Sequence, residues 1–256
     1  MGLFDKKFCD ICGGKIGMLG NRKLDDGNCC KDCAKLLSPF FSERRRSTVA
    51  DIKEQLAYRE QNKAAVAAFN TTRTLGLSTK VFLDEDACKF AVSSAKRLAD
   101  DNADIMDFSQ VTGCNIDIKE SNKELKRKTP DGKEVSFVPP KYCYTFEHFM
   151  IIHVNSPWFN EIRFPISKSI DVETTGIRGN ITNTQEIGRK SNEYRQAEAL
   201  GDEIKTALTK VRQDVRDGVA AANAPKIAQI CPLCNASCIP DAQGRCEYCG
   251  GAMTGL

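Results

Sequence analysis

The stretch KYCYTFEHFMIIHV, residues 141–154, decides the fold of the middle of the chain. Every second residue in it is aromatic, apolar or histidine, and this set comprises Tyr142, Tyr144, Phe146, His148, Met150 and Ile152. Successive side chains of a β-strand point to opposite faces, so an alternation of this length is typical of a strand with one buried face. We therefore expect one long strand here.

The regions before and after this strand carry further strand signals. Residues 80–83 and 89–92 flank the turn sequence Asp84-Glu85-Asp86, which predicts a hairpin. Residues 111–118 end in strict alternation, and residues 161–166 follow a turn at 155–160. We interpret residues 119–132, which end in Pro130-Asp131-Gly132, as a charged loop around a turn. About six or seven short antiparallel strands over roughly 100 residues predict a small barrel or sandwich.

We expect two helices, one on each side of these strands. Residues 49–69 contain neither Gly nor Pro, and Thr48 as N-cap with Asp51 at N3 forms a variant capping box. A second helix, from about residue 191 to 219, has an apolar stripe that we expect to pack on its own domain. The stripe comprises Tyr194, Ala197, Ile204, Leu208, Val211 and Val215. We interpret residues 220–225 as a linker.

The cysteines gather near the two ends of the sequence. Ten of the 13 lie in the first 33 or the last 26 residues, a placement that favours metal binding over a disulfide framework. In the N-terminal cluster, Cys9-x2-Cys12 and Cys30-x2-Cys33 can direct four thiolates at one point, the tetrahedral arrangement suited to Zn2+. Cys29 can replace Cys30 only with C-x3-C spacing, so we favour Cys30.

The C-terminal cluster has the spacing of a minimal zinc ribbon. Cys231-x2-Cys234 and Cys246-x2-Cys249 supply four ligands, and Cys238 is a spare thiol that can compete with them. For both clusters, redox-active dithiols and an iron site are the alternatives. Four thiolates leave no open coordination position on the metal. We therefore expect two structural Zn2+ ions that hold the protein together.

Two basic segments are candidates for binding anions. Residues 44–46, three arginines before the first helix, oppose its dipole and so serve another purpose. Solubility or pairing with acidic neighbours is one interpretation, and binding an anion or a partner is the other. Lys126, Arg127 and Lys128 can meet anionic headgroups, although Glu120, Glu124 and Asp131 interrupt this run.

Two resemblances bear on the fold. The opening Phe8-Cys-Asp-Ile-Cys-Gly-Gly-Lys-Ile-Gly, with Asn21-Arg-Lys-Leu-Asp-Asp-Gly and Cys30-Lys-Asp-Cys-Ala-Lys, resembles an uncharacterised zinc-ribbon-like domain of bacterial proteins, as far as about residue 70. The middle resembles bacterial pleckstrin-homology or GRAM-like domains in Lys80-Val-Phe-Leu-Asp, Asp107-Phe-Ser and Asn155-Ser-Pro-Trp-Phe. The second resemblance implies a seven-stranded barrel closed by a C-terminal helix. Neither implies a biochemical activity.

Taken together, these patterns predict an α+β fold in four parts. Residues 1–42 form an N-terminal zinc-binding module with four cysteine ligands, and residues 43–70 form a connecting helix. Residues 71–220 form a small antiparallel β-barrel, pleckstrin-homology-like or GRAM-like, with a C-terminal helix. Residues 221–256 form a linker and a C-terminal zinc ribbon.

Composition and motif content narrow the function. A net charge of +3 is too small to argue for nucleic acid. The chain lacks a long apolar segment for a membrane span or a secretory signal, so we expect a cytoplasmic protein. The two histidines, His148 and His153, lie five residues apart and therefore on opposite strand faces. Cys88, Cys114 and Cys143 are interpreted as buried core thiols, and we expect no catalytic activity.

The remaining expectation is a non-enzymatic zinc-binding adaptor or scaffold that binds other proteins. Peripheral binding of an anionic membrane surface through the barrel is one alternative, and nucleic-acid binding through a zinc ribbon is another. The sequence indicates no small-molecule substrate.

Overall fold

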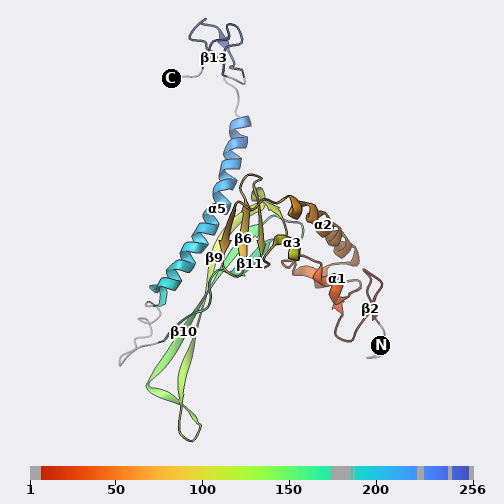
Figure 1. Ribbon diagram of the computed structural model, residues 1–256, viewed down its shortest axis with the longest axis vertical. Coiled ribbons are helices and arrows are strands. Elements are labelled where there is room, and N and C mark those ends of the chain that lie inside the picture. Colours follow the sequence, from red (N-terminus) through yellow and green to blue (C-terminus); the bar gives the residue numbers. More distant parts are fainter. Residues whose placement is uncertain (1–6, 174–185, 187, 224–227, 242–243, 254–256) are drawn as a thin grey trace. The chain divides into compact units, whose positions relative to one another are not determined.

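The computed structural model describes residues 7–173, 186, 188–223, 228–241 and 244–253, with backbone only for 210–223 (Figure 1). The chain divides into two compact units, Met1–Arg212 and Gln213–Leu256. Each unit is described by itself below. No helix among the described residues is both long enough and apolar enough to cross a membrane.

The first unit begins with a small module of two hairpins and a short helix. Strands β1 (Lys7–Phe8) and β2 (Lys15–Ile16) form one hairpin, and β3 (Arg22–Lys23) and β4 (Asn28–Cys29) form the other. Helix α1 (Lys31–Lys35) and the 3-10 helix η1 (Glu43–Arg46) follow. The module buries seven residues, namely Cys9, Ile16, Leu24, Cys29, Cys33, Leu37 and Ile52.

Ile52 comes from helix α2 (Val49–Ala68), which begins as the sequence predicts. The Thr48 hydroxyl accepts a hydrogen bond from the Asp51 amide at 3.2 Å, and the Asp51 carboxylate accepts one from the Thr48 amide at 2.8 Å. This reciprocal capping box satisfies two amides that an uncapped helix leaves unpaired. The predicted capping box is confirmed.

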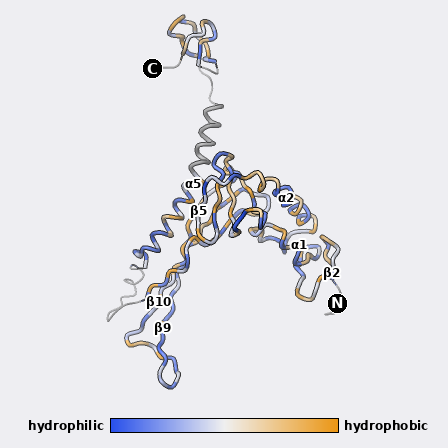
Figure 2. Tube along the Cα trace, viewed as in Figure 1, coloured by the Kyte–Doolittle hydropathy of each residue, from blue (hydrophilic) through white to orange (hydrophobic). Residues whose placement is uncertain are grey.

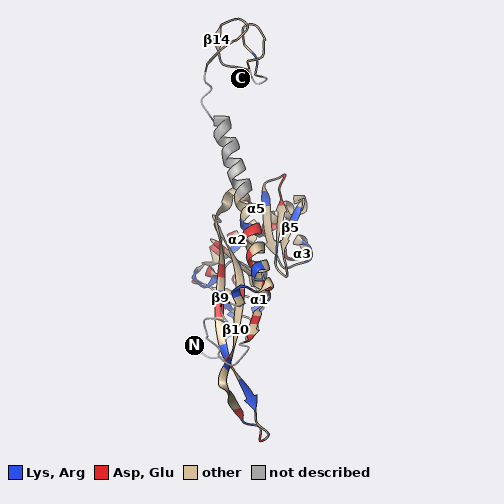
Figure 3. Ribbon diagram, turned by 90° about the vertical axis from the view of Figure 1, so that its left-hand side faces the viewer, with Lys and Arg blue, Asp and Glu red and all other residues tan. Residues whose placement is uncertain are grey.

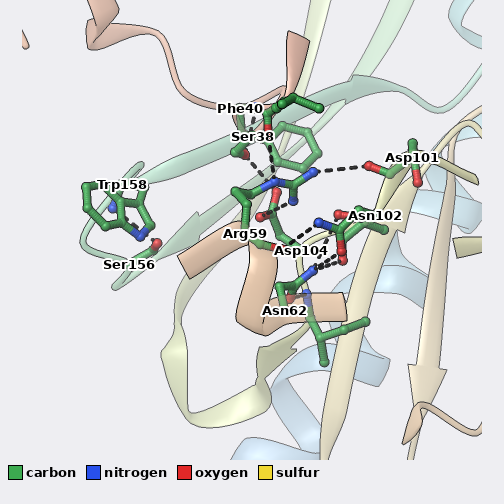
Figure 4. Close-up of polar contacts among 12 residues, drawn as sticks. Ser38, Phe40, Arg59, Asn62, Asp101, Asn102, Asp104, Ser156 and Trp158 are labelled. Carbon is green, nitrogen blue, oxygen red and sulfur yellow. Dashed lines mark hydrogen bonds and ion pairs between the residues drawn. The ribbon is translucent and has the colours of Figure 1, made fainter. Parts of the chain in front are cut away.

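Helix α2 also buries a polar face, which the sequence analysis does not anticipate. Arg59 donates to the Asp104 carboxylate at 2.7 Å and to the Leu36 carbonyl at 3.2 Å (Figure 4). Asn62 donates to the Ala103 carbonyl at 2.8 Å. Ser38, just after α1, also donates to Asp104 at 2.7 Å. One buried network thus fixes α2 between the N-terminal module and the loop after helix α3 (Leu98–Asp101).

The first sheet contains the predicted hairpin and two further strands. Its order is β5 (Arg73–Gly76), β6 (Lys80–Asp84), β7 (Lys89–Ser93) and β8 (Met106–Asp107), all antiparallel. The sequence predicts β6 and β7 but neither edge strand. Edge strands as short as β8 carry too few residues to show an alternation.

The second sheet is built around the strand that opens the sequence analysis. Strand β10 (Glu134–Val154) pairs with β9 (Val111–Lys128) on one side, and with β11 (Glu161–Pro165) and β12 (Ile170–Glu173) on the other. From residue 144 to 154 every even-numbered residue is buried, so the predicted buried face is confirmed.

The interpretation of residues 119–132 as a charged loop is wrong for most of the segment. Residues 119–128 continue β9 and pair with β10 as far as Lys128 opposite Glu134, and only the turn around Gly132 was correctly placed. Strands β9 and β10 together form a two-stranded ribbon. The outer end of this ribbon has no third strand beside it among the described residues, and its tip is hydrophilic (Figure 2). A ribbon with water on both faces has no apolar alternation for a sequence to show.

The two sheets share one apolar core, but neither closes into a barrel within the described residues. Phe90 is contributed by the first sheet, and Met150 and Ile162 by the second. The α+β class holds, with separate antiparallel sheets in place of the expected pleckstrin-homology-like barrel. The barrel is therefore not confirmed.

Helix α5 (Asn192–Asn223) packs on this core through Leu200, Ile204, Ala207 and Leu208. The stripe residues Tyr194, Ala197, Ile204 and Leu208 are buried, as predicted. The side chains of Val211 and Val215 lie outside the described residues. In the second unit, β13 (Gln229–Ile230) and β14 (Ser237–Cys238) form a short hairpin.

Candidate metal centres

Local backbone geometry in the N-terminal module directs the cysteines of each C-x2-C pair inward. In the first pair, the Gly13 amide donates to the Cys9 carbonyl and the Cys9 amide to the Gly14 carbonyl, both at 2.8 Å. Gly13 has φ +72°, a conformation that favours glycine. The second pair starts helix α1, where Cys30 is the N-cap and its sulfur accepts from the Cys33 amide at 3.3 Å.

These two turns bring four sulfur atoms together. The Sγ atoms of Cys9 and Cys33 are 3.9 Å apart, and those of Cys12 and Cys30 are 3.8 Å apart. All four lie within 4.8 Å of one another. A metal bound tetrahedrally at about 2.3 Å requires sulfurs about 3.8 Å apart. The cluster can therefore hold one metal ion.

Hydrogen bonds from the backbone prepare one thiol as a ligand. Burial opposes ionisation of Cys9, but amide donors at Cys12, Cys30 and Ile11 outweigh it and lower the pKa of Cys9 to about 6. The Cys30 amide lies 3.2 Å from this sulfur. A thiolate at neutral pH is the form of cysteine that binds metal.

The structure separates Cys29 from the four-sulfur cluster. Its buried thiol donates to the Cys30 carbonyl at 3.4 Å. Burial, and the nearby charges of Cys9 and Cys30, raise the pKa of Cys29 to about 11. Cys29 thus behaves as a neutral core residue, and Cys30 occupies the cluster.

The C-terminal module repeats the same geometry in the second unit. The Sγ atoms of Cys231 and Cys249 are 3.6 Å apart, as are those of Cys234 and Cys246, and all four lie within 4.8 Å of one another. Each knuckle is closed by a residue with positive φ, Asn235 at +56° and Gly250 at +68°. This cluster can also hold one metal ion.

Cys238 lies beside this cluster without belonging to it. Its buried sulfur is 3.5 Å from the Cys246 sulfur and 3.4 Å from the Met253 sulfur. Burial opposes ionisation of Cys246, but amides of Cys249 and Tyr248 lower the pKa of its thiol to about 6. Burial and the proximity of Cys246 instead raise the pKa of Cys238.

The other candidate residues are not gathered into one site. His148 is fully buried against Tyr194, with ring centroids 4.5 Å apart, and burial lowers its pKa. His153 faces the other way and contacts Asn115 at 3.2 Å. Of the three central cysteines only Cys114 is buried, so the interpretation of Cys88 and Cys143 as buried thiols is wrong.

The basic run on β9 is exposed near the tip of the ribbon (Figure 3). Strand alternation places Lys126 and Lys128 on one face and Arg127 on the other. Lys128 lies opposite Glu134 in the register. The three cations therefore do not form one surface.

Comparison with known proteins gives one match. Residues 7–55 match a family described as a domain of unknown function, DUF4428. The matched segment covers the N-terminal four-cysteine cluster and the first two turns of α2, and it fits a zinc-ribbon-like module. No curated protein and no solved structure matches the chain. The expected pleckstrin-homology or GRAM-like relationship is therefore not confirmed.

Proposed function

We propose that each four-cysteine cluster binds one Zn2+ ion with a structural role. The observation that carries this proposal is the sulfur geometry. In each cluster two sulfur pairs are 3.6–3.9 Å apart, close to the separation that a tetrahedral metal requires, and all four sulfurs lie within 4.8 Å of one another. Four thiolates fill the coordination sphere, leaving no position for substrate or water. The filled coordination sphere supports a structural, non-catalytic role for both metal sites.

Metal analysis of the purified chain tests this proposal. We expect two zinc equivalents, falling to one in Cys12→Ser and to one in Cys249→Ser. Cys29→Ser and Cys238→Ser are the matched controls and should retain two. Iron in place of zinc would contradict the metal assignment, and unchanged zinc in Cys12→Ser or Cys249→Ser would contradict the ligand assignment.

We further propose that the protein is a non-enzymatic adaptor whose C-terminal module contacts another protein. Leu233 and Tyr248, the third residues of the two knuckles, are 74% and 71% exposed. A Cβ on Gly251 would collide with Leu233, so this side chain reaches across to the second knuckle. Exposed aliphatic and aromatic side chains on a rigid module are typical of protein-binding surfaces.

Affinity capture with the full chain tests the adaptor proposal. We expect a discrete protein partner to be retained by the unmodified chain and lost from a Leu233→Ser/Tyr248→Ser variant with full zinc content. Leu19→Ser is the control, because Leu19 is even more exposed, at 90%, but lies in the N-terminal module. Equal capture by both variants would exclude the C-terminal surface as the contact.

Membrane and nucleic-acid binding receive less support. The cations on β9 are divided between two faces. Around the C-terminal cluster Arg245 is the one basic residue of the described part, which gives a weak footprint for phosphate backbones.

A further inference from the structure

A basic cavity of about 610 Å3 lies in the N-terminal module, between β3 and η1. Residues 21–25 and Arg44 and Arg45 line it. Four of these seven residues are cationic, namely Arg22, Lys23, Arg44 and Arg45, and Asp25 is the one carboxylate. The volume falls within the range of about 300–1,000 Å3 that small-molecule sites occupy.

The cations in this cavity have no counterion within the described part of the chain. None of the four forms an ion pair with a described residue, whereas the adjacent Arg46 pairs with Glu43 at 3.2 Å. The sequence alone leaves the three consecutive arginines equivalent. The structure distinguishes them. Arg44 and Arg45 line the cavity, whereas Arg46 lies outside the lining and pairs with Glu43.

Arg44 is held in place and crowded by like charges. Its guanidinium donates to the Lys23 carbonyl at 3.0 Å, which fixes η1 against β3. Partial burial lowers the pKa of Arg44, and the nearby charges of Arg22 and Arg45 lower it further, against the opposing effect of Cys29. An anion bound between these groups would relieve their mutual repulsion.

We propose that this cavity binds a phosphate or pyrophosphate group of a small molecule. Guanidinium groups bind phosphate through two parallel hydrogen bonds, and several of them facing one space form an oxyanion site. The lining contains no aromatic residue on which a base could stack. We therefore expect the cavity to recognise the phosphate group of the ligand and not a base.

A competing explanation is that the cations balance the charge of the nearby metal centre. Four thiolates around Zn2+ carry a net charge of about −2, and Arg44 lies near Cys29. On that explanation, neutralising Arg45 would reduce zinc affinity and leave phosphate binding absent or unchanged. The experiment therefore measures both.

The test is calorimetric titration of the zinc-loaded full chain with inorganic phosphate and with pyrophosphate at low salt. We expect saturable one-to-one binding of at least one of them. Arg45→Gln should weaken it about tenfold, the effect of losing one charge-assisted contact. Arg46→Gln is the matched control and should change it less than about twofold.

Zinc content and circular dichroism, measured on every variant, separate binding from folding. Arg44 and Arg22 are left intact because their guanidinium groups also donate to backbone carbonyls, Arg44 to Lys23 and Arg22 to Leu19 and Asn21. Three outcomes would overturn the proposal: no saturation with either anion, equal weakening by Arg46→Gln and Arg45→Gln, or reduced zinc affinity in Arg45→Gln with anion binding unchanged. Because pyrophosphate can itself chelate zinc, the zinc content of each variant is measured again after the titration.

Discussion

The two four-cysteine modules share their ligand spacing but differ in what surrounds the sulfurs. The N-terminal module buries Ile16, Leu24, Leu37 and Ile52 beside its cysteines. In the C-terminal module, the buried cluster consists of three cysteines and Met253. One module thus has an apolar core of its own, whereas the other has little besides its candidate ligands.

This difference shows how a segment of a few tens of residues can obtain stability. A chain this short cannot bury enough apolar surface to fold alone. The N-terminal module adds apolar area from α2, whose Ile52 is fully buried in it. The C-terminal module adds no such helix within its buried cluster. We therefore expect its fold to depend on a bound metal. Four predictions test this comparison.

Metal removal should affect the two modules unequally. With a strong chelator, we expect residues 229–253 to lose all amide-exchange protection, because binding of structural zinc supplies about 10–16 kcal/mol. The N-terminal module should lose protection around Cys9 and Cys30 but keep it in α2. Hydrogen exchange by mass spectrometry measures both in one sample. Equal loss in the two modules would contradict the comparison.

Arg59→Met should destabilise the first unit by about 4 kcal/mol, because it leaves the Asp104 carboxylate buried without a counterion. Urea unfolding can be followed by the fluorescence of Trp158, the only tryptophan. The centroid of its ring lies 6.1 Å from that of Tyr58 on α2. The exposed pair Arg97–Asp100 is the control, and Arg97→Met should cost less than about 1 kcal/mol. Adding Asp104→Leu to Arg59→Met should restore much of the stability.

Ile52→Ala should destabilise the N-terminal module by about 3 kcal/mol, through lost burial and the cavity that remains. The same urea titration measures this loss. Ile239→Ala, at a position 44% exposed in the second unit, is the control and should have little effect. If Ile52→Ala were as mild as its control, the N-terminal module would depend on metal as completely as the C-terminal one.

Thr48→Ala should have the smallest effect, about 1 kcal/mol, because it removes the side-chain half of the capping box. Thr48→Ser keeps the hydroxyl and should recover most of the loss. Hydrogen exchange of the Asp51 amide reports the change directly. Unchanged exchange in Thr48→Ala would mean that packing alone fixes the start of α2.

Much of the local structure was predictable because the signals are short-range. The cap at Thr48, the β6–β7 hairpin and the buried parity of β10 each depend on residues within a few positions of one another. The spacing of the cysteines likewise anticipated which sulfurs the structure brings together. In the outer half of β9 both faces of the strand are exposed to solvent, so the sequence shows no apolar alternation there. The prediction of a loop at this segment was therefore wrong.

The sequence by itself determined the type of the main elements, the start of α2 and the grouping of the cysteines, because caps, turns and alternation act between near neighbours. Only the tertiary structure decided that Cys29 is a core thiol, that Arg59 pairs with Asp104, and that two of three consecutive arginines line a cavity. Asp104 is 45 residues from Arg59, and such distant contacts depend on how the elements pack. That packing also left the two sheets open within the described part of the chain.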